Sequence, residues 1–132
     1  MRYFDKKAFT LPEMLLTALI LSYSLSVILA TYTNSLTLND ASRNLTIAVS
    51  HAQFVVESIR NTAFANIATN ISGGTWNWDT AAVTAQGLNA LKNESIATSS
   101  SGVNPLSITV TVSWDNLHGR SSSKALTTYI SG

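Results

Sequence analysis

Hydrophobic and polar residues follow three different patterns along this chain of 132 residues. The first is an uncharged run from Met14 to Ala30, which is mostly Leu, Ile, Val and Ala with a few hydroxyl residues. Extended back to Phe9, it covers about 20 residues, the length that an α-helix needs to cross a bilayer. The first pattern therefore predicts a membrane-spanning helix near the N-terminus.

The second pattern is an amphipathic stripe. Its apolar residues recur at intervals of three and four, which places them on one side of a helix. They are Leu45, Ala48, Val49, Ala52, Val55, Val56, Ile59 and Ala63. We expect the N-terminal helix to continue through this stripe and to end near residues 65–70, before the helix-breaking pair Gly73-Gly74.

The third pattern is strict alternation of apolar and hydroxyl residues in the C-terminal third, from Leu106 to Trp114. A period of two predicts a β-strand with one buried face. Residues 115–120 are expected to turn the chain, a second strand covers Ser123–Ser131, and a weaker one covers Asn93–Ser99. These strands predict a three-stranded antiparallel sheet whose apolar face packs on the second half of the long helix, an α+β fold.

The segment between helix and sheet gives a weaker signal. Gly74–Asp79 is expected to form a loop that carries Trp76 and Trp78, and Thr80–Lys92 a short helix broken by Gly87. A pair of Trp residues in a loop can bind a sugar or another surface. It more often closes the edge of a small core, which is the interpretation that we favour.

Composition excludes several function classes. Charged residues make up 11% of the chain, against roughly 25% in ordinary soluble proteins, and the formal net charge is +1. This charge gives no broad attraction to nucleic acid, and the absence of Cys removes thiolate sites. His51 and His118 have no second ligand at metal-binding spacing and are expected at the surface. We therefore predict no catalytic residue, no metal and no cofactor.

The N-terminus combines basic residues with one carboxylate in the apolar segment. Lys6 and Lys7 precede that segment, and no charged residue lies between Glu13 and Asp40. This asymmetry predicts a cytoplasmic N-terminus. A cleaved secretory signal fits less well, because a cut after Ala30 would leave a large Ile at the third position before it. Glu13 would cost about 3 kcal/mol at the centre of a bilayer and therefore needs a partner.

The residues around this carboxylate are Lys6-Lys7-Ala8-Phe9-Thr10-Leu11-Pro12-Glu13. They resemble the processing motif of type IV prepilins and of the pseudopilins of type II secretion. The resemblance implies that a prepilin peptidase cuts between Ala8 and Phe9 and methylates the new amine of Phe9. Glu13 would then meet the charged amine of a neighbouring subunit during assembly. Ala8 stands where the family usually has Gly, and Pro12 lies in the first helical turn, where it costs little.

The resemblance also implies a domain organisation. Residues 1–8 would be a cleaved leader, residues 9–35 a transmembrane and assembly segment, and residues 36–132 a pilin-like globular domain. The chain would be a single-pass inner-membrane protein that later enters a periplasmic or extracellular fibre. Its implied partners are the prepilin peptidase, other pilin or pseudopilin subunits, the inner-membrane assembly platform and membrane lipid.

The sequence leaves two questions of function open. It does not separate a major pilin from a minor pilin or a secretion pseudopilin. One alternative is a minor pilin whose external domain takes up DNA or adheres to surfaces through Trp76, Trp78 and Arg120. Another is a single-pass membrane protein unrelated to pili.

Overall fold

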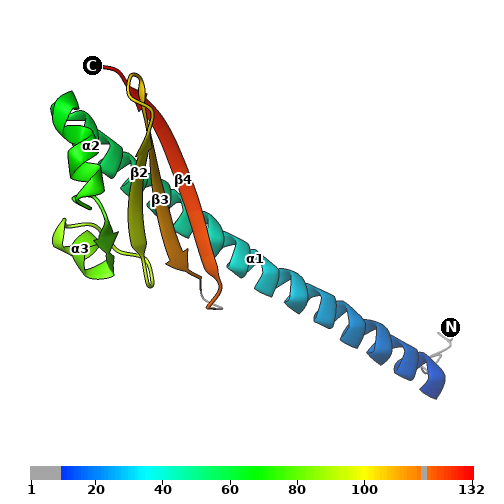
Figure 1. Cartoon of the computed structure of the whole chain (residues 1–132). Helices are drawn as coiled ribbons and strands as arrows, with labels where there is room; N and C mark the ends of the chain where they lie inside the picture. Colours follow the sequence, from blue (N-terminus) through cyan, green and yellow to red (C-terminus); the bar gives the residue numbers. More distant parts are fainter. Residues whose placement is uncertain (1–9, 117–118) are drawn as a thin grey trace, which may run out of the picture. The chain divides into compact units, whose positions relative to one another are not determined.

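The computed structural model describes residues 10–116 and 119–132, which form three helices and four strands (Figure 1). The helices are α1 (Leu11–Arg60), α2 (Phe64–Ser72) and α3 (Thr80–Ala85). The strands are β1 (Trp78–Asp79), β2 (Ser95–Ser101), β3 (Leu106–Asp115) and β4 (Ser121–Ile130). The chain divides into two compact units, the first ending at Asn39 and the second covering Asp40–Gly132. The predicted α+β class with a long apolar N-terminal helix is confirmed.

The part of α1 in the first unit is continuous, because its only Pro lies where no helical hydrogen bond is lost. Pro12 is in the first turn, where backbone N–H groups have no intrahelical partner. The carbonyl of Thr10, just before the helix, accepts hydrogen bonds from the backbone N–H groups of Glu13 at 3.0 Å and Met14 at 3.1 Å. Side chains from Thr10 to Asn39 are all exposed within the chain.

The sheet of the second unit is antiparallel, with the strand order β1-β2-β3-β4. β3 pairs with β4 over its whole length, from Leu106 opposite Ile130 to Asp115 opposite Ser121. The alternation in β3 has the predicted effect, because every second side chain is buried and the intervening Ser and Thr residues are half-buried on the opposite face. The sheet therefore has one apolar face and one hydroxyl-rich face.

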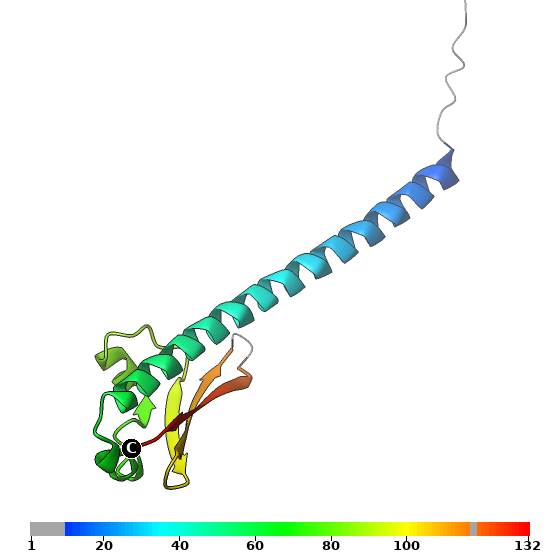
Figure 2. The ribbon, with the colours of Figure 1, turned by 90° about the horizontal axis from the view of Figure 1, so that it is seen from above.

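The amphipathic stripe of α1 packs on the apolar face of the sheet. The strands cross in front of this part of the helix in Figure 1, and the view from above shows them on one side of it (Figure 2). The buried apolar residues of α1 are Ala48, Ala52, Val55, Val56 and Ile59, and they share one core with the sheet. Leu45 was predicted in this stripe but is 42% exposed.

The long helix ends earlier than predicted. α1 stops at Arg60, the chain turns at residues 61–63, and the new helix α2 brings Ile67 and Ile71 into the core. Asn61 and Thr62 favour this turn because their side chains compete with helical hydrogen bonds. The Thr62 hydroxyl donates to the carbonyl of Ser58 at 3.1 Å.

The sheet also has one strand more than the three predicted. β1 has only two residues, Trp78 opposite Ile96 and Asp79 opposite Ser95. Two residues are too few to give an alternating pattern, so the sequence predicted a loop here. Asp79 then caps α3, because its side chain accepts a hydrogen bond from the N–H of Ala82 at 2.8 Å.

Replacing a core residue of β3 should destabilise the second unit far more than replacing its neighbour on the other face. Ile108 is 0% exposed, so Ile108→Ala should lower the free energy of unfolding by roughly 2–5 kcal/mol. Thr109→Ala, on the hydroxyl face, should cost less than about 1 kcal/mol. Denaturant unfolding of the full chain in detergent micelles measures both. Equal losses would contradict this packing.

Candidate functional site

Most of the large apolar side chains that are exposed in the described chain lie on α1 between Leu11 and Asn39. The exposed fractions of its large side chains include 76% for Leu11, 64% for Met14 and 66% for Leu19. Monomeric soluble proteins rarely expose so much contiguous apolar surface. By length and composition α1 can cross a membrane, and the 20 residues Leu11–Ala30 span about 30 Å, the thickness of a hydrocarbon core.

The hydroxyl groups of this segment are compatible with an apolar environment. Seven of the Ser and Thr side chains donate to backbone carbonyls three or four residues earlier, at 2.6–2.9 Å; they are Thr17, Ser22, Ser24, Ser26, Thr31, Thr33 and Thr37. A hydroxyl that is bonded within its own helix leaves no donor unsatisfied in hydrocarbon. The segment is therefore less polar than its composition suggests.

Glu13 lies in the first turn of α1, at an exposed position. Its Oε2 lies 3.5 Å from the backbone N–H of Thr10, in the geometry of half a capping box. A carboxylate is also favourable at the N-terminus of a helix because of the helix dipole. The predicted cleavage and methylation positions, Ala8 and Phe9, lie outside the described residues. The described part of the chain offers Glu13 no cation within 4 Å.

A shallow hollow on the apolar surface lies just after Glu13. It is lined by Met14, Thr17, Ala18 and Leu21. These positions are i, i+3, i+4 and i+7 along the helix, the arrangement that receives one side chain of a neighbouring helix in knobs-into-holes packing. The two small residues at its centre leave space for such a side chain.

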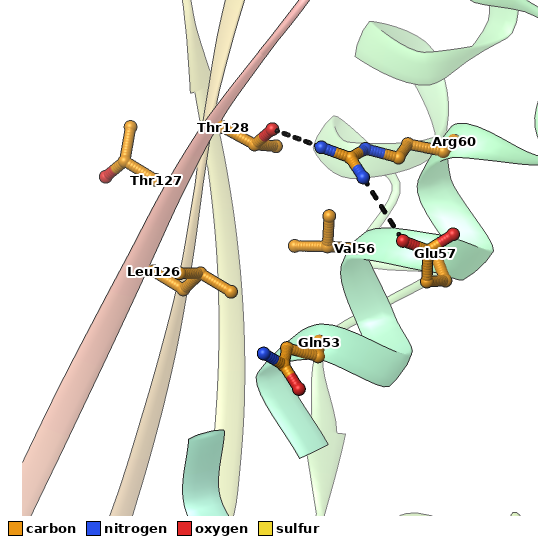
Figure 3. A pocket seen from close by; sticks show the side chains of 7 residues that line it. All are labelled: Gln53, Val56, Glu57, Arg60, Leu126, Thr127 and Thr128. Atoms are coloured by element: carbon orange, nitrogen blue, oxygen red, sulfur yellow. Dashed lines mark hydrogen bonds and ion pairs between the residues drawn. The ribbon is translucent and has the colours of Figure 1, made fainter. Parts of the chain in front are cut away.

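A groove in the second unit lies between α1 and β4 (Figure 3). It has a volume of about 400 Å³, and its lining residues are Gln53, Val56, Glu57, Arg60, Leu126, Thr127 and Thr128. Val56 is buried and Leu126 is half-buried, so the floor is apolar. Arg60 donates from Nη1 to Glu57 Oε1 and from Nη2 to Thr128 Oγ1, both at 3.1 Å, and so joins the helix to the strand.

The three residues predicted as possible surface contacts do not form one site. Trp76 is 4% exposed, and its Nε1 donates to the Ser58 hydroxyl at 3.0 Å, so its ring closes the core. Trp78 is half-buried against Phe54, with ring centroids 6.1 Å apart. Arg120 is exposed in the turn before β4. Trp76 is therefore not available as a contact for DNA or sugar.

The prediction that His51 lies at the surface is wrong. His51 is 4% exposed, and its Nδ1 lies 2.7 Å from Oε1 of the buried Glu94. The other carboxylate oxygen of Glu94 accepts a hydrogen bond from the backbone N–H of Leu91 at 2.6 Å. The sequence held a signal for the burial of His51, because it lies three residues after Ala48 and four before Val55, within the apolar stripe. His118 lies outside the described residues.

A second, polar hollow contains two cations. It is lined by Arg43, Asn44 and Ile47 of α1, by residues 89–92, and by Asp115 and Asn116 at the end of β3. Neither Arg43 nor Lys92 has an acidic group within 4 Å among the described residues. The same residues contain no group of three or more His, Asp or Glu side chains that could hold a metal ion.

Removing the Glu94 carboxylate should strongly destabilise the second unit. Glu94→Ala leaves the Leu91 N–H and the His51 ring without their acceptor, so we expect a loss of roughly 3–5 kcal/mol in unfolding free energy. Glu94→Gln retains one acceptor oxygen and should lose less. The matched control is Glu57→Ala, since this carboxylate pairs with Arg60 on the surface, where such pairs contribute about 0–1 kcal/mol. Thermal and denaturant unfolding measure all three, and a Glu94→Ala variant as stable as Glu57→Ala would contradict the assignment.

Comparison with known proteins identifies no relative. No family model matches this chain, and no curated protein or solved structure matches it.

Proposed function

We propose that this chain is a structural subunit of a type IV pilus or a related pseudopilus. In this proposal a prepilin peptidase removes residues 1–8 by cutting between Ala8 and Phe9 and then methylates the Phe9 amine. The mature subunit stays in the inner membrane through the apolar part of α1, with its N-terminus towards the cytoplasm. An assembly platform then packs it with other subunits into a periplasmic or extracellular fibre.

The observation that carries the proposal is the combination of sequence motif and exposed helix. Phe-Thr-Leu-Pro-Glu begins directly after a basic leader and a small residue. A continuous helix begins within this motif, at Leu11, and its side chains up to Asn39 are all exposed in the isolated chain. A helix that is apolar on all sides requires cover on all sides. Lipid supplies that cover before assembly, and the helices of neighbouring subunits supply it within a fibre.

The position of Glu13 supports a role in selecting the packing of neighbouring subunits. Cutting after Ala8 creates a positively charged amine at Phe9, and a carboxylate in an apolar environment is tolerated when such a charge pairs with it. One buried polar residue in an apolar helix interface fixes the register between helices, because other registers leave it unpaired. The hollow at Met14, Thr17, Ala18 and Leu21 lies one turn further along and can receive a side chain of the neighbour.

The second unit supports the proposal because it has a core of its own. Its buried residues come from the last turns of α1, from α2 and α3, and from the sheet. A domain with an independent core can stay folded while the apolar helix changes its surroundings. The described residues show no arrangement that favours catalysis, and the role proposed for this unit is to form the exterior of the fibre.

The processing step predicts a new N-terminus. Mass spectrometry of the protein extracted from membranes of its native host should show a chain that begins at Phe9 and carries one added methyl group. Ala8→Leu places a large side chain before the cut and should leave the precursor intact. A chain that retains Met1 in a host with an active prepilin peptidase would overturn the proposal.

The charge of Glu13 should matter for assembly but not for folding. Glu13→Gln retains an acceptor for the Thr10 N–H but removes the charge. The variant should therefore insert in the membrane normally, and its fibre yield should fall by at least about tenfold. Glu57→Gln removes the same charge from an exposed surface position and serves as the control. Sheared fibres are quantified against the membrane pool. Normal fibre yield from Glu13→Gln would contradict the pairing role.

A further inference from the structure

β4 is an open edge of the sheet. It is the last strand in the order β1-β2-β3-β4, and its ten residues pair with β3 on one side only. In an antiparallel strand alternate residues direct their N–H and C=O groups towards each side. Within the described chain, the outward backbone groups of Ser121–Ile130 make no backbone hydrogen bond. A row of donors and acceptors is therefore available along the whole strand.

Apart from one Lys, this edge lacks the devices that usually prevent another strand from pairing with it. Natural edge strands are kept short, bulged, interrupted by Pro, or loaded with charge. β4 is as long as β3, pairs with it in an unbroken register, and contains no Pro. Its single charged residue is Lys124. The edge is therefore a suitable template for an additional strand.

The groove described above lies directly beside this edge. In Figure 3 the side chains of Leu126 and Thr128 point towards α1, and Thr127 points to the opposite side of β4. A strand added to β4 would place alternate side chains over the apolar floor at Val56 and Leu126. The charges at the rim cancel, because Glu57 and Arg60 pair with each other. The groove therefore favours uncharged apolar side chains over charged ones.

We propose that the edge of β4 and the adjacent groove bind an extended, uncharged polypeptide segment of another protein, which adds to the sheet as a fifth strand. The backbone supplies the hydrogen bonds and the alternate apolar side chains supply specificity, as in other cases of strand addition. Only an extended backbone presents donors and acceptors at the spacing of β4, so a sugar or a small molecule cannot satisfy this edge. The site is separate from the apolar segment Leu11–Asn39, and its existence does not depend on fibre assembly.

A peptide with the sequence of Leu106–Trp114, which contains no charged side chain, is a suitable probe. It alternates large apolar residues with Ser and Thr, and in the fold the same sequence already pairs with the other side of β4. A fluorescent form would be titrated with the full chain in detergent micelles, and binding followed by anisotropy. The backbone amides of β4 should shift in NMR spectra, and those of α3 should not.

Two N-methylated peptides test strand addition directly. One is methylated at the amides of its apolar positions and the other at the amides of its Ser and Thr positions. Since alternate amides of an added strand face β4, one pattern should weaken binding by about tenfold or more, and the other should leave it within about threefold. Equal effects of the two patterns, or no binding of the parent peptide, would overturn the proposal.

Matched variants of β4 locate the site. Thr128→Lys places a long cation in the groove and should weaken peptide binding by at least about tenfold. Thr127→Lys places the same side chain on the opposite face of the same strand and should weaken binding far less. Thermal melting of both variants verifies that they fold. Equal binding by the two variants would overturn the assignment. Pairing of two copies of the chain through β4, with exclusion of the peptide, would also overturn it.

Discussion

The second unit depends on one buried carboxylate. Glu94 is distant in sequence from α1, yet its oxygens lie 2.7 Å from the His51 ring and 2.6 Å from the Leu91 N–H. Its own carbonyl accepts a hydrogen bond from the Thr80 hydroxyl at the start of α3. A buried carboxylate is tolerable only when it is fully bonded, so these contacts fix where the irregular segment 87–94 meets the helix. In the described chain no buried side-chain nitrogen or oxygen lacks a partner.

The two parts of helix α1 have different surroundings, although they belong to one continuous helix. Its last turns bury a single stripe against the sheet, and its residues up to Asn39 bury nothing within the chain. The first arrangement is stabilised by intramolecular packing, and the second requires lipid or other helices. This division explains why so small a chain can carry so much apolar surface without a correspondingly large core.

Long and regular patterns in the sequence predicted most of the architecture. The apolar segment and the alternation from Leu106 to Trp114 each extend over many residues, and the structure contains both elements.

Short or tertiary features could not be predicted in this way. β1 exists only because Trp78 and Asp79 lie beside β2, and the His51–Glu94 pair joins residues 43 positions apart. The burial of Trp76 agrees with the favoured interpretation of the Trp pair. Its hydrogen-bond partner, the Ser58 hydroxyl, lies 18 residues away and could not be identified from local sequence. The cleavage position and the partner of Glu13 stay predictions, since the first lies outside the described residues and the second requires another subunit.

The hydroxyl groups that bond to their own helix have a consequence for reversibility. Thr17, Ser22 and Ser26 donate to carbonyls of the same helix, so their hydrogen bonds are independent of the surroundings. Moving the helix from lipid to a protein interface, or back again, would neither break nor form these bonds. These hydrogen bonds therefore oppose movement of the helix in neither direction, because the same donors and acceptors stay paired in both surroundings.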